Sequence, residues 1–81
     1  MNRTEALNAV KGAIAEVVPG TDFTDVGPDD KFREVLELDS LDFLSFVEIL
    51  GERTGVRIDE DDYPRLTTLS DSAGLLASRM E

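Results

Sequence analysis

The chain has 81 residues and a formal net charge of −10, because 18 Asp and Glu outnumber eight Lys and Arg. It has no cysteine and no histidine, which excludes disulfides and thiolate metal sites and removes the commonest general base. So acidic a surface repels nucleic acid and anionic membranes and favours protein partners with basic patches.

No apolar run approaches the ~20 residues that span a bilayer, and the first five residues lack the apolar stretch of a signal peptide. We therefore expect a single cytoplasmic domain over residues 1–81. We expect it to be a monomer without nucleic-acid or membrane partners.

The first predicted helix covers residues 4–18. Its apolar residues recur at three- and four-residue spacing and form one stripe, made of Leu7, Val10, Ile14 and Val17. Asn2 followed by Glu5 has capping-box spacing, and Thr4 is an alternative cap. Pro19 and the glycine after it end the helix.

Residues 19–39 predict neither a long helix nor a strand. A connection of this length is uncommon in a compact domain unless it is functional or carries some structure. One short helical turn is indicated by the spacing of Phe32, Val35 and Leu36. Asp29 or Asp30 is its expected cap.

A second helix is predicted from Ser40 or Leu41 to Arg53, with Gly55 as its C-terminal stop. On a helical wheel one broad arc is apolar and should be buried: Phe43, Leu44, Phe46, Val47 and Leu50. The opposite arc is polar: Asp42, Ser45, Glu48 and Glu52. Leu41 falls on the polar side, next to Ser40, although single exposed leucines are common.

The last third of the chain predicts an extended linker at residues 56–58 and a short acidic turn ending at Pro64. Thr68 and Asp71 have capping spacing before a final helix. The apolar stripe of that helix consists of Leu69, Ala73, Leu76 and Met80, with Leu75 beside it. The whole pattern predicts a small all-α bundle of three main helices and one or two short turns.

We expect no intrinsic catalytic activity. Ser40 has no histidine to activate it, and neither lysine of the chain is predicted to be desolvated. The acidic run at residues 59–62 lacks the glycine and the terminal glutamate of an EF-hand loop. It is therefore predicted to be a solvated turn, and no metal site is expected.

Ser40 itself has two interpretations from local physics. A serine at a helix N-terminus is a suitable place for a phosphate group, because free backbone N–H groups and the helix dipole favour negative charge there. Serine is also an ordinary N-cap, and local features alone favour a simple cap.

The segment Asp39-Ser40-Leu41, followed by an amphipathic helix, resembles the modification motif of acyl carrier proteins. Phe32 before the motif and Val47 within the helix also fit the family pattern. So do the stretch at residues 55–58 with the acidic turn after it, and the residues 66–69 that lead into the last helix. The resemblance covers residues 32–76 without a gap and, with the first helix, nearly the whole chain.

The resemblance implies a carrier with an acyl-carrier-like bundle. A phosphopantetheinyl transferase would move 4′-phosphopantetheine from coenzyme A onto Ser40, next to Asp39 and Leu41, and acyl groups would be held on its thiol as thioesters. The acyl chain would be lined by apolar residues that also suit ordinary core packing: Phe32, Phe46, Val47, Leu50, Ile58 and Leu66.

The resemblance also implies docking of acyl-loading and acyl-processing enzymes, through their basic patches, on the second helix. The matching positions are the leucine after the serine and the acidic residues around it: Leu41, Asp39, Asp42, Glu48 and Glu52.

Several positions depart from the family pattern. Glu37, followed by Leu38, stands where the family often has glycine. Ser45 stands at a commonly acidic position and Glu48 at a commonly apolar one. Phe43 stands where a smaller residue is frequent. These departures favour a specialised stand-alone carrier in a secondary or dedicated acyl pathway over the general fatty-acid biosynthesis carrier. Two alternatives stay open, an unmodified acidic helical interaction module and a peptidyl carrier. The leucine after the serine and the acidic second helix favour the acyl type over the peptidyl type.

Overall fold

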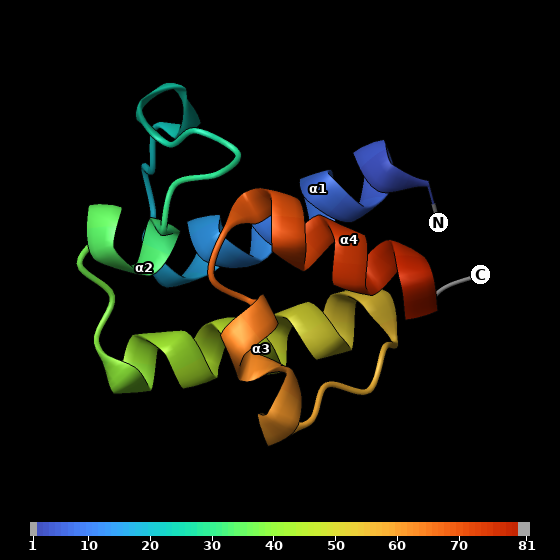
Figure 1. Ribbon diagram of the computed structural model, residues 1–81. Coiled ribbons are helices and arrows are strands. Elements are labelled where there is room, and N and C mark those ends of the chain that lie inside the picture. The colour runs from blue at the N-terminus through green and yellow to red at the C-terminus, as the bar shows by residue number, and fades with distance from the viewer. Residues whose placement is uncertain (1, 80–81) are drawn as a thin grey trace.

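The structure, a computed structural model, describes residues 2–79, and the all-α prediction is confirmed. Its elements in chain order are α1 (Arg3–Val17), η1 (Phe23–Asp25), α2 (Phe32–Val35), α3 (Ser40–Thr54), η2 (Glu60–Arg65) and α4 (Leu69–Arg79). The helix α1 packs against both α3 and α4, and α2 lies near the start of α3 (Figure 1). No helix within residues 2–79 combines the length and apolar character that crossing a membrane requires.

Helix α1 begins one residue before its predicted start. Asn2 is the cap, since its side-chain oxygen accepts the backbone N–H of Glu5 at 2.8 Å, and the alternative Thr4 lies inside the helix. The buried residues of α1 are Ala6, Val10, Ala13 and Ile14. The predicted Leu7 and Val17 are only partly buried. Two alanines enter the core instead because α1 packs against two helices at once, and small side chains let the backbones approach.

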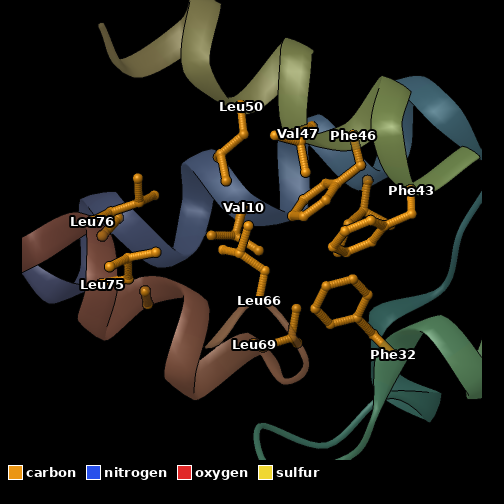
Figure 2. Packing of buried hydrophobic residues seen from close by; sticks show 14 of the residues in the cluster. Val10, Phe32, Phe43, Phe46, Val47, Leu50, Leu66, Leu69, Leu75 and Leu76 are labelled. Atoms are coloured by element: carbon orange, nitrogen blue, oxygen red, sulfur yellow. The ribbon is translucent and has the colours of Figure 1, made fainter. Parts of the chain in front are cut away.

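The core is one hydrophobic cluster with an aromatic group at one end (Figure 2). Phe32 meets Phe46 edge-on with ring centroids 5.3 Å apart, and Phe46 lies 6.0 Å from Phe43. Phe43 in turn meets Tyr63 edge-on at 5.4 Å. Such pairs contribute about 0.5–1.5 kcal/mol each beyond the area they bury. They attach α2 and η2 to the first half of α3.

The predicted cap of the short helix α2 is wrong. Lys31 occupies the N-cap position without a side-chain bond, while the Asp30 carboxylate accepts the backbone N–H of Gly27 at 2.8 Å and Asp29 is exposed. Tertiary hydrogen bonds hold the segment instead. The backbone N–H of Phe32 donates to the Thr67 carbonyl at 3.2 Å, which joins α2 to the turn before α4.

The link between α2 and α3 turns at Glu37, whose φ of 54° is left-handed. This conformation costs a residue with a Cβ about 1–2 kcal/mol of conformational free energy, which is why glycine is typical of such a turn. The turn lets Leu38 enter the core, with 6% of its surface exposed. The sequence departure at Glu37 therefore falls on the one residue of this link that would best suit glycine.

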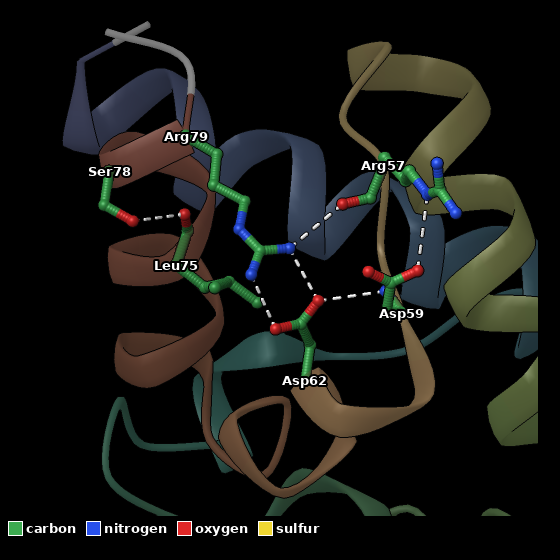
Figure 3. Close-up of polar contacts among 6 residues, drawn as sticks. All are labelled: Arg57, Asp59, Asp62, Leu75, Ser78 and Arg79. Carbon is green, nitrogen blue, oxygen red and sulfur yellow. Dashed lines mark hydrogen bonds and ion pairs between the residues drawn. The ribbon is translucent and has the colours of Figure 1, made fainter.

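The acidic turn at residues 59–62 is not simply solvated, because Asp62 is paired with Arg79 (Figure 3). The Arg79 guanidinium donates to both carboxylate oxygens of Asp62, at 2.5 and 2.6 Å, and to the Arg57 carbonyl at 3.0 Å. Asp62 is 10% exposed. η2 also extends past Pro64 to Arg65, one residue beyond the predicted end.

Helix α4 begins as predicted. The Thr68 hydroxyl accepts the backbone N–H of Asp71 at 3.0 Å, and Leu69, Ala73, Leu75 and Leu76 are buried. The fourth residue of the predicted stripe, Met80, lies outside the described residues.

The Asp62–Arg79 pair predicts a pH-dependent contribution to stability. The hydrogen bonds from Arg79, and then the backbone N–H of Asp59, hold the pKa of Asp62 below its ordinary 3.8. A lowered pKa in the folded state gives stability that is present above pH 3.8 and is lost as the pH falls below it. We expect Asp62→Asn to unfold more easily than the wild type at pH 6, and this difference to shrink between about pH 4 and pH 2.

Urea unfolding at a series of pH values measures that difference. Asp61→Asn is the matched control, since Asp61 is an exposed neighbour in η2 and has no ion pair within residues 2–79. A difference for Asp62→Asn that stays constant from pH 6 to pH 2 would contradict the role of the pair.

Candidate functional site

The helix α3 starts at Ser40, but Asp39 and not Ser40 is its N-cap. Asp39 has extended backbone (φ −84°, ψ −177°), and its carboxylate accepts the backbone N–H of Asp42 at 2.8 Å. Asp42 reaches back to the N–H of Asp39 at 3.4 Å, which completes a capping box. The expectation that Ser40 caps the helix is therefore wrong. Ser40 is the first helical residue.

The Ser40 hydroxyl is therefore exposed and takes no part in capping the helix. Its contact is with Arg33, whose Nη2 donates to Ser40 Oγ at 3.3 Å. Sequence reasoning missed Arg33. The available signal was a cation seven residues before the serine, in the short turn that Phe32 anchors.

A cavity of about 570 Å³, called the site cavity below, opens beside Ser40. Its residues come from α2, the start of α3 and the segment from η2 to α4: Lys31, Arg33, Glu34, Ser40, Phe43, Leu44, Tyr63, Pro64, Leu66 and Thr67. The wheel placed Leu44 in the core, but it is 44% exposed. It lines this cavity together with Phe43 and Tyr63.

The residues predicted to line an acyl chain are mostly in the core. Five are buried, namely Phe32, Phe46, Val47, Leu50 and Leu66, and Ile58 is partly buried against them. Of the six, only Leu66 also lines the site cavity. Phe43 and Tyr63 line it too and were not among those predicted residues; their rings meet edge-on at the cavity wall.

The residues predicted to dock partners lie along one exposed side of α3. Leu41 is 74% exposed and is not part of the hydrophobic core. Glu48 and Glu52 are exposed, and neither joins an ion pair within residues 2–79. Asp39 and Asp42 hold each other's backbone in the capping box, so their carboxylates are already partly engaged.

The residues around Ser40 fit the attachment of a phosphate-linked group by a separate enzyme. The hydroxyl is exposed at the first residue of a 15-residue helix, and a guanidinium lies beside it. Both favour a negative group. The chain has no histidine, and Arg33, the hydrogen-bond partner of Ser40 Oγ, is a donor and not an acceptor, so it does not activate the serine as a nucleophile.

Comparison with known proteins identifies the family. Residues 8–76 match the family model described as a phosphopantetheine attachment site. The chain is 33% identical to the acyl carrier protein of Rubrobacter xylanophilus over 89% of this chain and 88% of that one. It is 32% identical to that of Acidothermus cellulolyticus, over 96% and 92% of the two chains. The protein of Thermosynechococcus vestitus is 35% identical, over 88% and 86%.

No solved structure matches the chain significantly. The family match covers most of the chain, and the relatives match along nearly their full length. The chain therefore belongs to the acyl carrier protein family, whose members are carriers and not catalysts, and whose prosthetic group is a covalently attached 4′-phosphopantetheine.

Proposed function

We propose that Ser40 is the attachment residue, and that the chain holds acyl groups as thioesters and presents them to partner enzymes. The observation that carries this proposal is the exposed hydroxyl at the first residue of α3, freed from capping by Asp39. It lies inside the matched residues 8–76. We further propose that the chain is a cytoplasmic monomer. We also propose that it serves a specialised acyl pathway, and the sequence departures at Glu37, Phe43 and Ser45 support this pathway assignment.

The loading step needs chemistry that this chain does not supply. Ser40 Oγ forms a bond to the phosphorus of coenzyme A that carries the pantetheine. The phosphoanhydride bond breaks, and adenosine 3′,5′-bisphosphate leaves. We assign the base that takes the hydroxyl proton to the transferase, because this chain has no histidine and the side chain that contacts Ser40 Oγ is the donor Arg33. The attached group supplies a thiol, which the cysteine-free chain lacks.

We propose that partner enzymes dock on the exposed side of α3. Leu41 offers an apolar anchor directly beside Ser40, and Glu48 and Glu52 offer unengaged negative charge. Asp39 and Asp42 add charge at the helix start, although their capping bonds limit how far their carboxylates can turn. Basic patches on the transferase and on acyl-processing enzymes would complement this side.

We propose that an acyl chain enters through the site cavity. Leu66 belongs both to the cavity wall and to the core, and Phe43 contacts Phe46 immediately behind it. Displacing these rings would open the way to the other predicted lining residues, Phe32, Val47, Leu50 and Ile58.

Incubation with coenzyme A and a broad-specificity phosphopantetheinyl transferase tests the attachment. Intact mass spectrometry should show one phosphopantetheine added to the wild type and none to Ser40→Ala. Ser78→Ala is a matched control that removes another exposed helical serine and should still be loaded. An unmodified wild type would leave the acidic interaction module as the better account, and loading of Ser40→Ala would place the attachment elsewhere.

Charge reversal on α3 tests the docking surface. Glu48→Lys should raise the KM of the transferase for this chain by roughly 5–10-fold at low salt, because it replaces an attraction to a basic patch by a repulsion. The effect should shrink at high salt through screening.

The matched control is Glu5→Lys, which makes the same change of charge near the start of α1, at the opposite end of the molecule from α2 (Figure 1). Equal KM values for Glu48→Lys and the wild type at low salt would remove this side of α3 as the docking surface.

A further inference from the structure

The Arg33 guanidinium is held beside Ser40 by three contacts. Its Nη2 donates to Ser40 Oγ at 3.3 Å, and its Nε donates to the Leu38 carbonyl at 3.4 Å. Its Cζ lies 5.0 Å from the centroid of the Phe43 ring, which is cation–π distance. Arg33 directly follows Phe32, whose fully buried ring anchors α2. The guanidinium is therefore in place before any group joins Ser40.

The charge of Arg33 is not neutralised by a carboxylate in the described part of the chain. The ion pairs within residues 2–79 use Arg53, Arg57 and Arg79, and both hydrogen-bond acceptors of Arg33 are uncharged oxygens. An arginine keeps its charge at any ordinary pH, and its fork of donors matches phosphate oxygens. In a chain of net charge −10, a cation that has no ion pair within residues 2–79 thus lies directly beside Ser40.

A phosphate on Ser40 would otherwise meet mostly negative neighbours. Asp39 and Asp42 flank the attachment point, and Glu34 lines the same cavity. The N-terminus of α3 offsets part of this repulsion through its free N–H groups. The phosphorus would be bonded to Ser40 Oγ and its free oxygens would lie two bonds beyond Oγ, within reach of the Arg33 donors after a small rotation of the side chain.

The position of Arg33 also favours one direction for the rest of the arm. Arg33 touches Ser40 and Phe43, and all three line the site cavity. An arm that leaves a phosphate held by Arg33 would start across Phe43 towards Tyr63. The cavity volume of about 570 Å³ lies within the usual range of small-molecule sites.

We propose that Arg33 is a positioning residue that binds the phosphodiester on Ser40 and directs the phosphopantetheine arm along the Phe43–Tyr63 wall of the site cavity. The proposal rests on attachment at Ser40. In this arrangement the chain supplies its own counter-ion for the prosthetic group, and Arg33 restricts the arm whenever no partner enzyme is bound.

The melting temperatures of unloaded and loaded protein test the proposal, with loading verified by intact mass. The phosphate–Arg33 contact forms only in the folded state. The change in Tm upon loading should therefore be about 4 °C more positive in the wild type than in Arg33→Met, which keeps the apolar stem and removes the charge. Arg33→Lys, a point charge without the planar fork, should recover part of this difference.

Lys31→Met is the matched control, because Lys31 lines the same cavity without contacting Ser40. Its loading should change Tm as in the wild type. If Arg33→Met responded to loading as the wild type does, Arg33 would not bind the phosphate. If Lys31→Met lost the response as fully as Arg33→Met, the effect would be general attraction, and the assignment to Arg33 would fall.

A measurement on the wild type alone supplies a second test. The NMR resonance of Arg33 Nε–H should shift on loading and exchange more slowly with water, while that of Arg65, exposed in η2, should not change. The ³¹P resonance should shift between wild type and Arg33→Met. A loaded wild type with an unchanged Arg33 resonance would overturn this inference alone, whereas a wild type that is never loaded would overturn the proposed function.

Discussion

The site depends on the capping box between Asp39 and Asp42 at the start of α3. It satisfies backbone N–H groups that a helix start leaves free, and it does so without Ser40. The hydroxyl of Ser40 is therefore exposed on the first turn, next to free N–H groups that favour a negative substituent. If Ser40 were the cap, a group attached to its oxygen would compete with the helix for that oxygen. Assigning the cap to Asp39 separates folding from attachment.

The aromatic group of the core places the rest of the site. Contacts from Phe32 to Phe46, and from Phe43 to Tyr63, fix α2 and η2 against the first half of α3. The same packing positions Arg33, the residue after Phe32, beside Ser40. Phe43 is shared between the core and the wall of the site cavity, so a change in core packing at this ring would alter the site as well.

Most helix limits and the all-α class could be predicted because apolar periodicity and caps are local signals. The predicted start of α1 differs from the observed one by one residue, and the predicted Thr68 cap of α4 is confirmed. The predicted cap of α3 is wrong because Asp39 and Ser40 are both good capping residues. The choice between them depends on the backbone angles at Asp39, which composition does not encode.

The remaining differences have tertiary causes. Leu44 lies on the apolar arc of the wheel, but a wheel does not show that this side of α3 faces an open cavity. Arg33 reaches Ser40 only because the chain turns at Glu37 with a positive φ, and no helical periodicity predicts such a contact. In the sequence Asp62 is indistinguishable from the other acidic residues of its turn. Its ion pair forms because the end of α4 places Arg79 against it.

The central claim is that the Ser40 hydroxyl does not contribute to the stability of the fold. The most direct test compares the free energies of unfolding of Ser40→Ala and Asp39→Ala with that of the wild type. Urea unfolding should show Ser40→Ala within about 0.5 kcal/mol of the wild type, as expected for a surface position. Asp39→Ala should lose about 1 kcal/mol through its missing cap. A loss for Ser40→Ala as large as that for Asp39→Ala would contradict the claim, because the serine hydroxyl would then be part of the structure that holds the helix.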